Sequence, residues 1–205
     1  MHRALLLPAL LVVGLTACKD KEEADVPPGL GPLEENTAVL PSNETVAFSS
    51  GEEDDYVYTH ARGLVNVALA DVAVCVADPD VGVDRRRVSE YTVTTDVDPT
   101  YEVSYDVLTT VEDIVTLTYT LTWKQGDRGD GTYGVHWSKT DGDDLLELLE
   151  GSVLLQPVSD TSTDVGIIEH LEAALISTED TEQFTGDFYA SILACSHGEA
   201  LPTYE

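Results

Sequence analysis

Basic side chains are scarce in this sequence of 205 residues, which has 10 Lys and Arg against 39 Asp and Glu and a formal net charge of −29. The acidic residues are spread along the chain and are not gathered in one tail. A surface of this charge repels nucleic acids and anionic lipid surfaces. The composition therefore argues against nucleic-acid binding and indicates a solvated acidic surface suited to a salty exterior.

Motifs that carry chemistry are also missing. The sequence has no His-x-x-x-His, Cys-x-x-Cys or Gly-x-Ser-x-Gly pattern and no phosphate-binding glycine loop, so we predict no catalytic residues, no metal site and no cofactor. The stretches "GDRGDGTYG" (126–134) and "DGDD" (141–144) have the residue types of a calcium loop. They lack its complete spacing and its closing glutamate, so we expect both to be hairpin loops.

Long hydrophobic runs are absent too. The run "ALLLPALLVVGL" (4–15) follows the basic residue Arg3, and it is shorter than the roughly 20 residues of a membrane-spanning helix. A short basic head followed by such a run is typical of a secretory signal peptide.

The run ends in Leu15-Thr16-Ala17-Cys18, which resembles the bacterial lipobox. The resemblance implies that residues 1–17 are a lipoprotein signal peptide and that Cys18 carries the lipid that attaches the chain to a membrane. It places the protein in the cell envelope of a bacterium, and Lys19 after the cysteine favours the outer membrane. The alternative is an ordinary signal peptide cut after Ala17, with an incidental cysteine.

Cysteines number three, so two remain if Cys18 is lipidated. In an exported protein, Cys75 and Cys195 can form a disulfide, but they can equally be two buried thiols.

Residues 18–43 are acidic and contain several Pro and Gly, which predicts a flexible tether. Residues 44–205 then form one domain, and a hydrophobic content of 42% is enough for a core.

This domain is predicted to be α+β. Segments rich in Thr, Val and Tyr, separated by turn signals, predict an antiparallel meander over 87–96, 101–110, 114–125, 131–139, 145–158 and 164–175. The stretch 177–198 has helix start and stop signals and an apolar stripe. The stretch 64–78 is ambiguous between strand and helix.

The stretches "VCVADPDVGVDRRRVSEYTV" (74–93) and "GSVLLQPVSDTSTDVGIIEHLEA" (151–173) resemble the early part and the late hairpin of the START-like, or SRPBCC, superfamily. This resemblance, over roughly 45–200, implies a helix-grip fold. A curved antiparallel sheet of about six to seven strands would grip a long C-terminal helix, with two short helices after the first strand. Either "TVAFSS" (45–50) or "DYVYTHA" (55–61) can supply that first strand.

Members of that superfamily bind apolar ligands in a cavity between sheet and helix. The alternation of one strand and the stripe of the last helix supply candidate lining residues. They are Val115, Leu117, Tyr119, Leu121, Trp123, Phe184, Phe188 and Ile192. Most of them can instead simply fill the core. His136, beside Trp137, and His170, after Glu169, are candidate polar groups of a pocket, although strand histidines are more often surface or satisfied core residues.

Three functions fit these observations. The first is a non-enzymatic lipoprotein that binds an apolar small molecule or lipid. The second is an interaction lipoprotein with a filled core that acts through its acidic surface. The third is a cyclase- or hydrolase-like enzyme, for which the sequence shows no acid–base pair.

Overall fold

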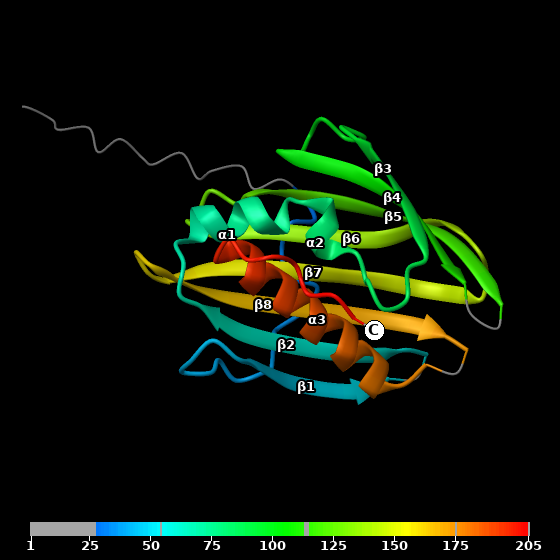
Figure 1. Cartoon of the computed structure of the whole chain (residues 1–205), viewed down its shortest axis with the longest axis horizontal. Coiled ribbons are helices and arrows are strands. Elements are labelled where there is room, and N and C mark those ends of the chain that lie inside the picture. Colours follow the sequence, from blue (N-terminus) through cyan, green and yellow to red (C-terminus); the bar gives the residue numbers. More distant parts are fainter. Residues whose placement is uncertain (1–27, 54, 113–114, 175, 205) are drawn as a thin grey trace, which may run out of the picture.

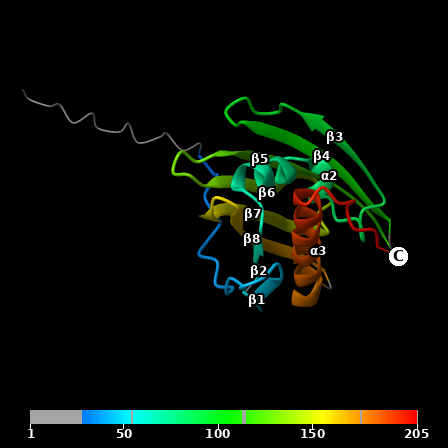
Figure 2. The same cartoon turned by 60° about the vertical axis from the view of Figure 1, so that its left-hand side comes forward.

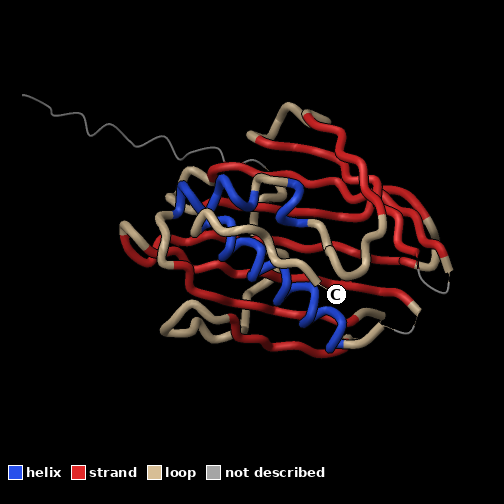
Figure 3. The backbone as a smooth tube through the Cα atoms, viewed as in Figure 1, coloured by secondary structure: helices blue, strands red, loops and turns tan. Residues whose placement is uncertain are grey.

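The protein folds around a single antiparallel sheet. The computed structural model describes residues 28–53, 55–112, 115–174 and 176–204. Eight strands are hydrogen-bonded in the order β1-β2-β8-β7-β6-β5-β4-β3, and the long helix α3 crosses one face of the sheet (Figure 1). The sheet curves around that helix, and α1 and α2 lie on the same side as α3 (Figures 2 and 3). The predicted α+β, helix-grip architecture is confirmed.

The strands are β1 (Val46–Glu52), β2 (Val57–Val65), β3 (Glu90–Thr95), β4 (Val103–Glu112), β5 (Thr116–Asp127), β6 (Tyr133–Gly142), β7 (Leu146–Ser159) and β8 (Ser162–Ala173). The helices are α1 (Leu69–Val76), α2 (Pro79–Gly82) and α3 (Thr178–Ser196).

Two strands precede the helices, where the sequence analysis expected one. Both "TVAFSS" and "DYVYTHA" are used, because β1 and β2 pair as a hairpin with Val46 opposite Gly63. The expected count of six to seven strands was therefore too low by at least one. The ambiguous stretch 64–78 is both strand and helix, since Leu64 and Val65 end β2 and Leu69 begins α1.

Local signals set the limits of the helices. The Ser177 side chain accepts a hydrogen bond from the Asp180 amide and the Asp180 side chain bonds the Ser177 amide, a reciprocal cap at the start of α3. Asp78 caps α2 by a single hydrogen bond, which its side chain accepts from the Asp80 amide, and Pro79 occupies the first turn.

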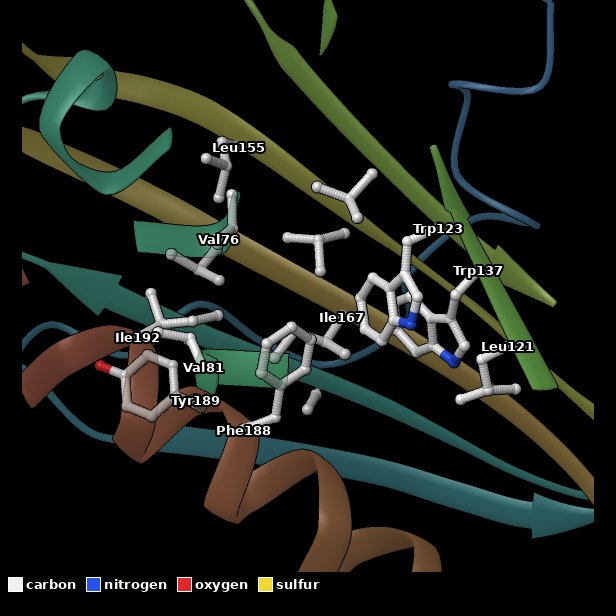
Figure 4. Close-up of a cluster of buried hydrophobic side chains, with 14 of the residues drawn as sticks. Val76, Val81, Leu121, Trp123, Trp137, Leu155, Ile167, Phe188, Tyr189 and Ile192 are labelled. Carbon is white, nitrogen blue, oxygen red and sulfur yellow. The ribbon is translucent and has the colours of Figure 1, made fainter. Parts of the chain in front are cut away.

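The core lies between the sheet and the second half of α3. Phe188 meets Trp123 and Trp137 edge-on, with ring centroids 6.0 Å and 5.9 Å apart, and the two indoles stack at 4.7 Å (Figure 4). Ile192 is fully buried one turn further on. Aromatic pairs of this geometry add to the free energy gained from burying their area.

A disulfide joins Cys75 in α1 to Cys195 in the last turn of α3, with 5.8 Å between the two Cα atoms. The sequence left open whether Cys75 and Cys195 form a disulfide or are two buried thiols, and the structure has the disulfide. The bridge fixes α1 to the distal end of α3.

Residues 28–38 pack on the sheet, on the face opposite α3 (Figure 2). We call residues 28–38 the strap. Leu30 is fully buried, the Leu33 amide donates to the Ser152 hydroxyl of β7 at 3.0 Å, and Asn36 donates to the Ala61 carbonyl of β2. Within the predicted tether 18–43, residues 28–38 are therefore held against the sheet by long-range contacts that composition does not reveal. Residues 18–27 lie outside the described residues, as does the predicted signal peptide.

Candidate functional site

A cavity of about 560 Å³ lies between the sheet and the first half of α3, next to the aromatic core. Strands β4 to β8 form one wall, and α2 with the segment after it and the start of α3 form the other. Val115 and Leu145, which lie at the strand ends beside it, are more than half exposed. The cavity is therefore open to solvent at that end. A volume of this size lies within the range of small-molecule sites.

The lining is mainly aliphatic and aromatic. Its residues are Pro79, Gly82, Val83, Asp84, Arg87, Val88, Val107, Thr109, Val111, Val115, Leu117, Tyr119, Leu121, Trp123, Trp137, Leu145, Leu146, Leu149, Glu169, Leu171, Ala173, Ala174, Ile176, Asp180 and Phe184.

The structure brings six of the eight predicted lining residues to this cavity. They are Val115, Leu117, Tyr119, Leu121, Trp123 and Phe184. Phe188 and Ile192 are not among the lining residues and belong to the packed core instead. The helix stripe does face the sheet, but packing closes over its second half, so the prediction of a cavity role for these two residues is wrong.

Glu169 is the most unusual residue of the lining. Its alternation with Ile167 and Leu171 in β8 puts it on the face toward α3, and it is 1% exposed. Its Oε2 atom has no hydrogen-bond partner among the described residues. Burial raises the pKa of Glu169 well above its ordinary value, and the nearby Asp84 carboxylate raises it further.

A second orphaned polar atom lies on the same wall. The indole Nε1 of Trp137 is buried and has no hydrogen-bond partner among the described residues. Trp137 pairs with Gly151 of β7, and Gly151 pairs with Glu169 of β8. A Cβ on Gly151 would lie 1.9 Å from the Trp137 ring, so the glycine lets the indole lie across β7 towards Glu169.

The arginines at the edge of the cavity are hydrogen-bonded within the domain. Arg87 donates to Asp180 at 2.6 Å, which links the segment after α2 to the start of α3. Arg86 pairs with Asp187 of α3, and Arg85 donates to the carbonyl oxygen of Asp80. Two of the three arginines at 85–87 therefore pair with acidic side chains of α3.

The two histidines that were candidate polar groups of the pocket do not line the cavity. His136 and His170 lie on the strap face, and it is Trp137 and Glu169 beside them that line the cavity. The signal that could have found Glu169 is its place between Ile167 and Leu171 on the apolar face of an alternating strand.

On the strap face, Glu34 joins two histidines. Its Oε1 lies 2.7 Å from His60 Nε2 and 3.1 Å from His170 Nε2, and His170 Nδ1 lies 3.2 Å from Glu150. Burial raises the pKa of Glu34, but the hydrogen bonds from the two imidazoles lower it by more, so the net shift is downward. Within the described ranges, no group of three or more His, Cys, Asp or Glu has the arrangement of a metal site.

The Asp- and Gly-rich stretch 126–134 contains the hairpin loop 128–132 between β5 and β6, as expected, and its first and last residues pair in those strands. Its carboxylates bond to the loop itself, since Asp127 accepts from the Gly129 amide at 2.6 Å and Asp130 from the Thr132 amide at 3.0 Å.

Solved structures of lipid-transfer proteins share this arrangement. Human StAR-related lipid transfer protein 5 matches with a TM-score of 0.55 and 12% identity over 77% of this chain and 85% of that chain. The STAR-related lipid transfer protein from Xanthomonas axonopodis matches with 0.51 and 12% over 77% and 94%. The human StarD13 (DLC2) lipid transfer and protein localization domain matches with 0.51 and 13% over 77% and 85%. At these identities the likeness is one of fold, and the chain has the START-like, helix-grip fold. No protein-family model and no curated protein sequence matches the chain.

Proposed function

We propose that the protein is a lipid-anchored lipoprotein of a bacterial cell envelope, and that its START-like domain binds an apolar ligand without transforming it. The observation that carries the proposal is the cavity of about 560 Å³, whose walls are mostly aliphatic and aromatic. Such a surface favours ligands that leave water, because burial of apolar area supplies the driving force. The solved structures with the same fold include lipid-transfer proteins, which supports the same ligand class.

A non-enzymatic role is supported by the side chains around the cavity. Among the described lining residues, the ionisable groups other than Tyr119 are Asp84, Arg87, Asp180 and Glu169, and the arginine is paired with Asp180. Histidine, serine and cysteine, which usually act as bases and nucleophiles, do not occur in that set.

Native mass spectrometry tests ligand binding. The full chain with Cys18→Ser is expressed for export, purified without detergent and extracted with organic solvent. We expect an apolar molecule that leaves on denaturation, or that binds when a lipid extract is added. A mass that stays that of the free chain after exposure to the extract would contradict the binding proposal. It would favour an interaction module, for which recovery of a stoichiometric protein partner from the envelope is the positive test.

Metabolic labelling with an alkyne-bearing palmitate tests the anchor. We expect the full chain to be labelled in a bacterial host and the Cys18→Ser variant to lose the label. An unlabelled but processed wild-type chain would indicate an ordinary signal peptide and would contradict the lipoprotein proposal. The inner or outer membrane then follows from fractionation, for which Lys19 favours the outer membrane.

A further inference from the structure

The cavity opens at one end of the sheet, and the described chain begins at the other. The open end, which we call the mouth, lies beside Val115 and Leu145, where β4 is followed by β5 and β6 by β7 (right in Figure 1). At the opposite end, the hydroxyl group of Tyr101, between β3 and β4, donates to the Pro28 carbonyl oxygen at 2.7 Å. Strand β5, of 12 residues, joins the two ends and spans about 36 Å.

A lipid on Cys18 would set the orientation of the domain. The linker 19–27 spans about 30 Å at most. With the mouth on the bilayer, Pro28 would stand about 36 Å above it, so the linker would have to be stretched to its limit along the whole sheet. With the Pro28 end towards the bilayer, the linker keeps its conformational freedom. The anchor therefore favours a mouth that faces away from its own membrane.

Carboxylates dominate the charge around the mouth. The turn from β6 to β7 contributes Asp143 and Asp144, which are both exposed. The basic groups near the mouth are bonded within the domain, since Lys139 donates to two backbone carbonyl oxygens beside that turn and Arg87 donates to Asp180. A rim of this charge attracts basic groups and repels anionic surfaces.

A hollow of about 240 Å³ adjoins the mouth, between the β1–β2 turn and the end of β8. Glu53, Asp55 and Glu172 line it, and it shares Ile176 with the cavity. Desolvation raises the pKa of Glu172, and the carboxylates of Glu147 and Asp55 raise it further. A cationic side chain placed here would relieve the repulsion among these carboxylates.

We propose that the mouth is the docking surface for a protein that presents Lys or Arg side chains around an apolar contact, and that the cavity exchanges its ligand with this partner and not with the anchoring bilayer. Val115 and Leu145, which are more than half exposed, supply the apolar contact. A second copy of the chain, or an anionic bilayer, would bring negative charge against negative charge. This inference rests on the proposed function, because it takes the anchor and the ligand from it.

Photo-crosslinking in the protein's own cells tests the inference. The lipidated full chain carries p-benzoylphenylalanine in place of Leu145, at the mouth. The control position is Val158, at the other end of β7, because the two side chains are equally exposed, at 55% and 54%.

Two triple variants of the same charge are combined with each position. The mouth variant removes the three acids of the hollow by the changes Glu53→Gln, Asp55→Asn and Glu172→Gln. The control variant removes three exposed acids at the other end of the domain by the changes Asp96→Asn, Asp160→Asn and Glu199→Gln.

We expect the Leu145 position to give one cross-linked protein, with Lys and Arg clustered on its contact surface, and the Val158 position not to give it. The mouth variant should lower the yield of this product about tenfold, because it loses three charge pairs, and the control variant should stay within about twofold.

Three results overturn the inference. Cross-links from Leu145 to lipid alone would put the mouth on the bilayer, and no product from Leu145 would mean that nothing docks there. Equal yields from the mouth and control variants would show that these carboxylates do not hold the partner. Palmitate labelling and native mass spectrometry of the same chains keep the two proposals apart. A chain that is lipidated and holds a ligand, but gives one of these three results, loses only the docking inference, whereas an unlabelled or ligand-free chain contradicts the proposed function as well.

Discussion

Glu169 shows at the scale of one residue how a binding site can oppose stability. A carboxyl group that is buried without a partner must either stay protonated or be ionised in an apolar surrounding, and both cost free energy relative to the solvated group of the unfolded chain. The free protein therefore has a defect that a substitution can repair.

We predict that Glu169→Leu stabilises the ligand-free protein by about 1–3 kcal/mol at pH 7.5. The pKa of Glu169 is raised on folding, so between its unfolded and folded values the folded chain binds more protons and stability falls as pH rises. The gain should therefore shrink towards pH 4.5, where the unfolded chain holds the proton as well. Thermal unfolding of both proteins at the two pH values measures it, and a gain that is equal at both, or a loss at pH 7.5, would refute the prediction.

Gly63, in contrast to Glu169, contributes to stability, because its lack of a side chain leaves room for close packing. A Cβ at this position would lie 2.1 Å from the ring of Tyr189, whose hydroxyl donates to the Leu64 carbonyl at 2.7 Å. The absence of a side chain thus lets α3 approach β2 closely.

Gly63→Ala should cost about 1–3 kcal/mol of stability through this clash. Gly166→Ala in the neighbouring strand β8 is the control, because the nearest atom to its new Cβ is 3.4 Å away. Both changes restrict the unfolded chain equally, so their difference in urea unfolding isolates the clash. Equal stabilities of the two variants would show that Tyr189 moves aside freely.

At the scale of elements, the disulfide cross-links α1 and α3, two helices that pack on the same face of the sheet (Figure 1). Cys75 and Cys195 are 120 residues apart in sequence, so the bridge closes a long loop in the unfolded chain. Cross-links over long loops restrict the unfolded ensemble strongly.

The double substitution Cys75→Ala and Cys195→Ala should lower the free energy of unfolding by about 2–5 kcal/mol. Addition of a reductant to the parent chain should reproduce much of that loss, whereas it should leave the variant unchanged. Labelling of the denatured, unreduced parent with Cys18→Ser should find no free thiol. Two labelled thiols per chain would contradict the bridge.

Most elements could be predicted from the sequence because their signals are local. Segments rich in Thr, Val and Tyr between turn signals predicted β4 to β8 within a few residues, and the Ser and Thr cap candidates with acids after them marked the start of α3. Cavity and core could not be told apart in the same way. Phe184 and Phe188 are one turn apart on one stripe, and only the packing of the indoles against Phe188 decides that one lines the cavity and the other does not.

The strap escaped prediction for a related reason. Its sequence has the Pro, Gly and acidic residues of a linker, and its order comes from partners more than 100 residues away, such as Ser152 at the Leu33 amide. Composition indicates whether an isolated segment is flexible. The strap is held in place by its contacts with the sheet, which composition does not show.

For the whole molecule, the strap completes the domain by covering the second face of the sheet. Leu30→Ala should cost about 2–4 kcal/mol, because Leu30 is fully buried. Val39→Ala is the control, since Val39 is 78% exposed and should change stability by less than about 0.5 kcal/mol. Equal midpoints in urea unfolding would mean that the strap does not contribute to the stability of the domain.

The strap also sets how far the domain can move from a membrane. If Cys18 carries lipid as proposed, only nine residues, 19–27, separate the anchor from the first described residue, Pro28. They can span at most about 30 Å, whereas a tether reaching to residue 43 would span about 85 Å. With a linker of that length, the anchored domain would not carry a bound ligand across an aqueous compartment. The protein would act in place, taking up and presenting molecules within about one protein diameter of the bilayer that holds it.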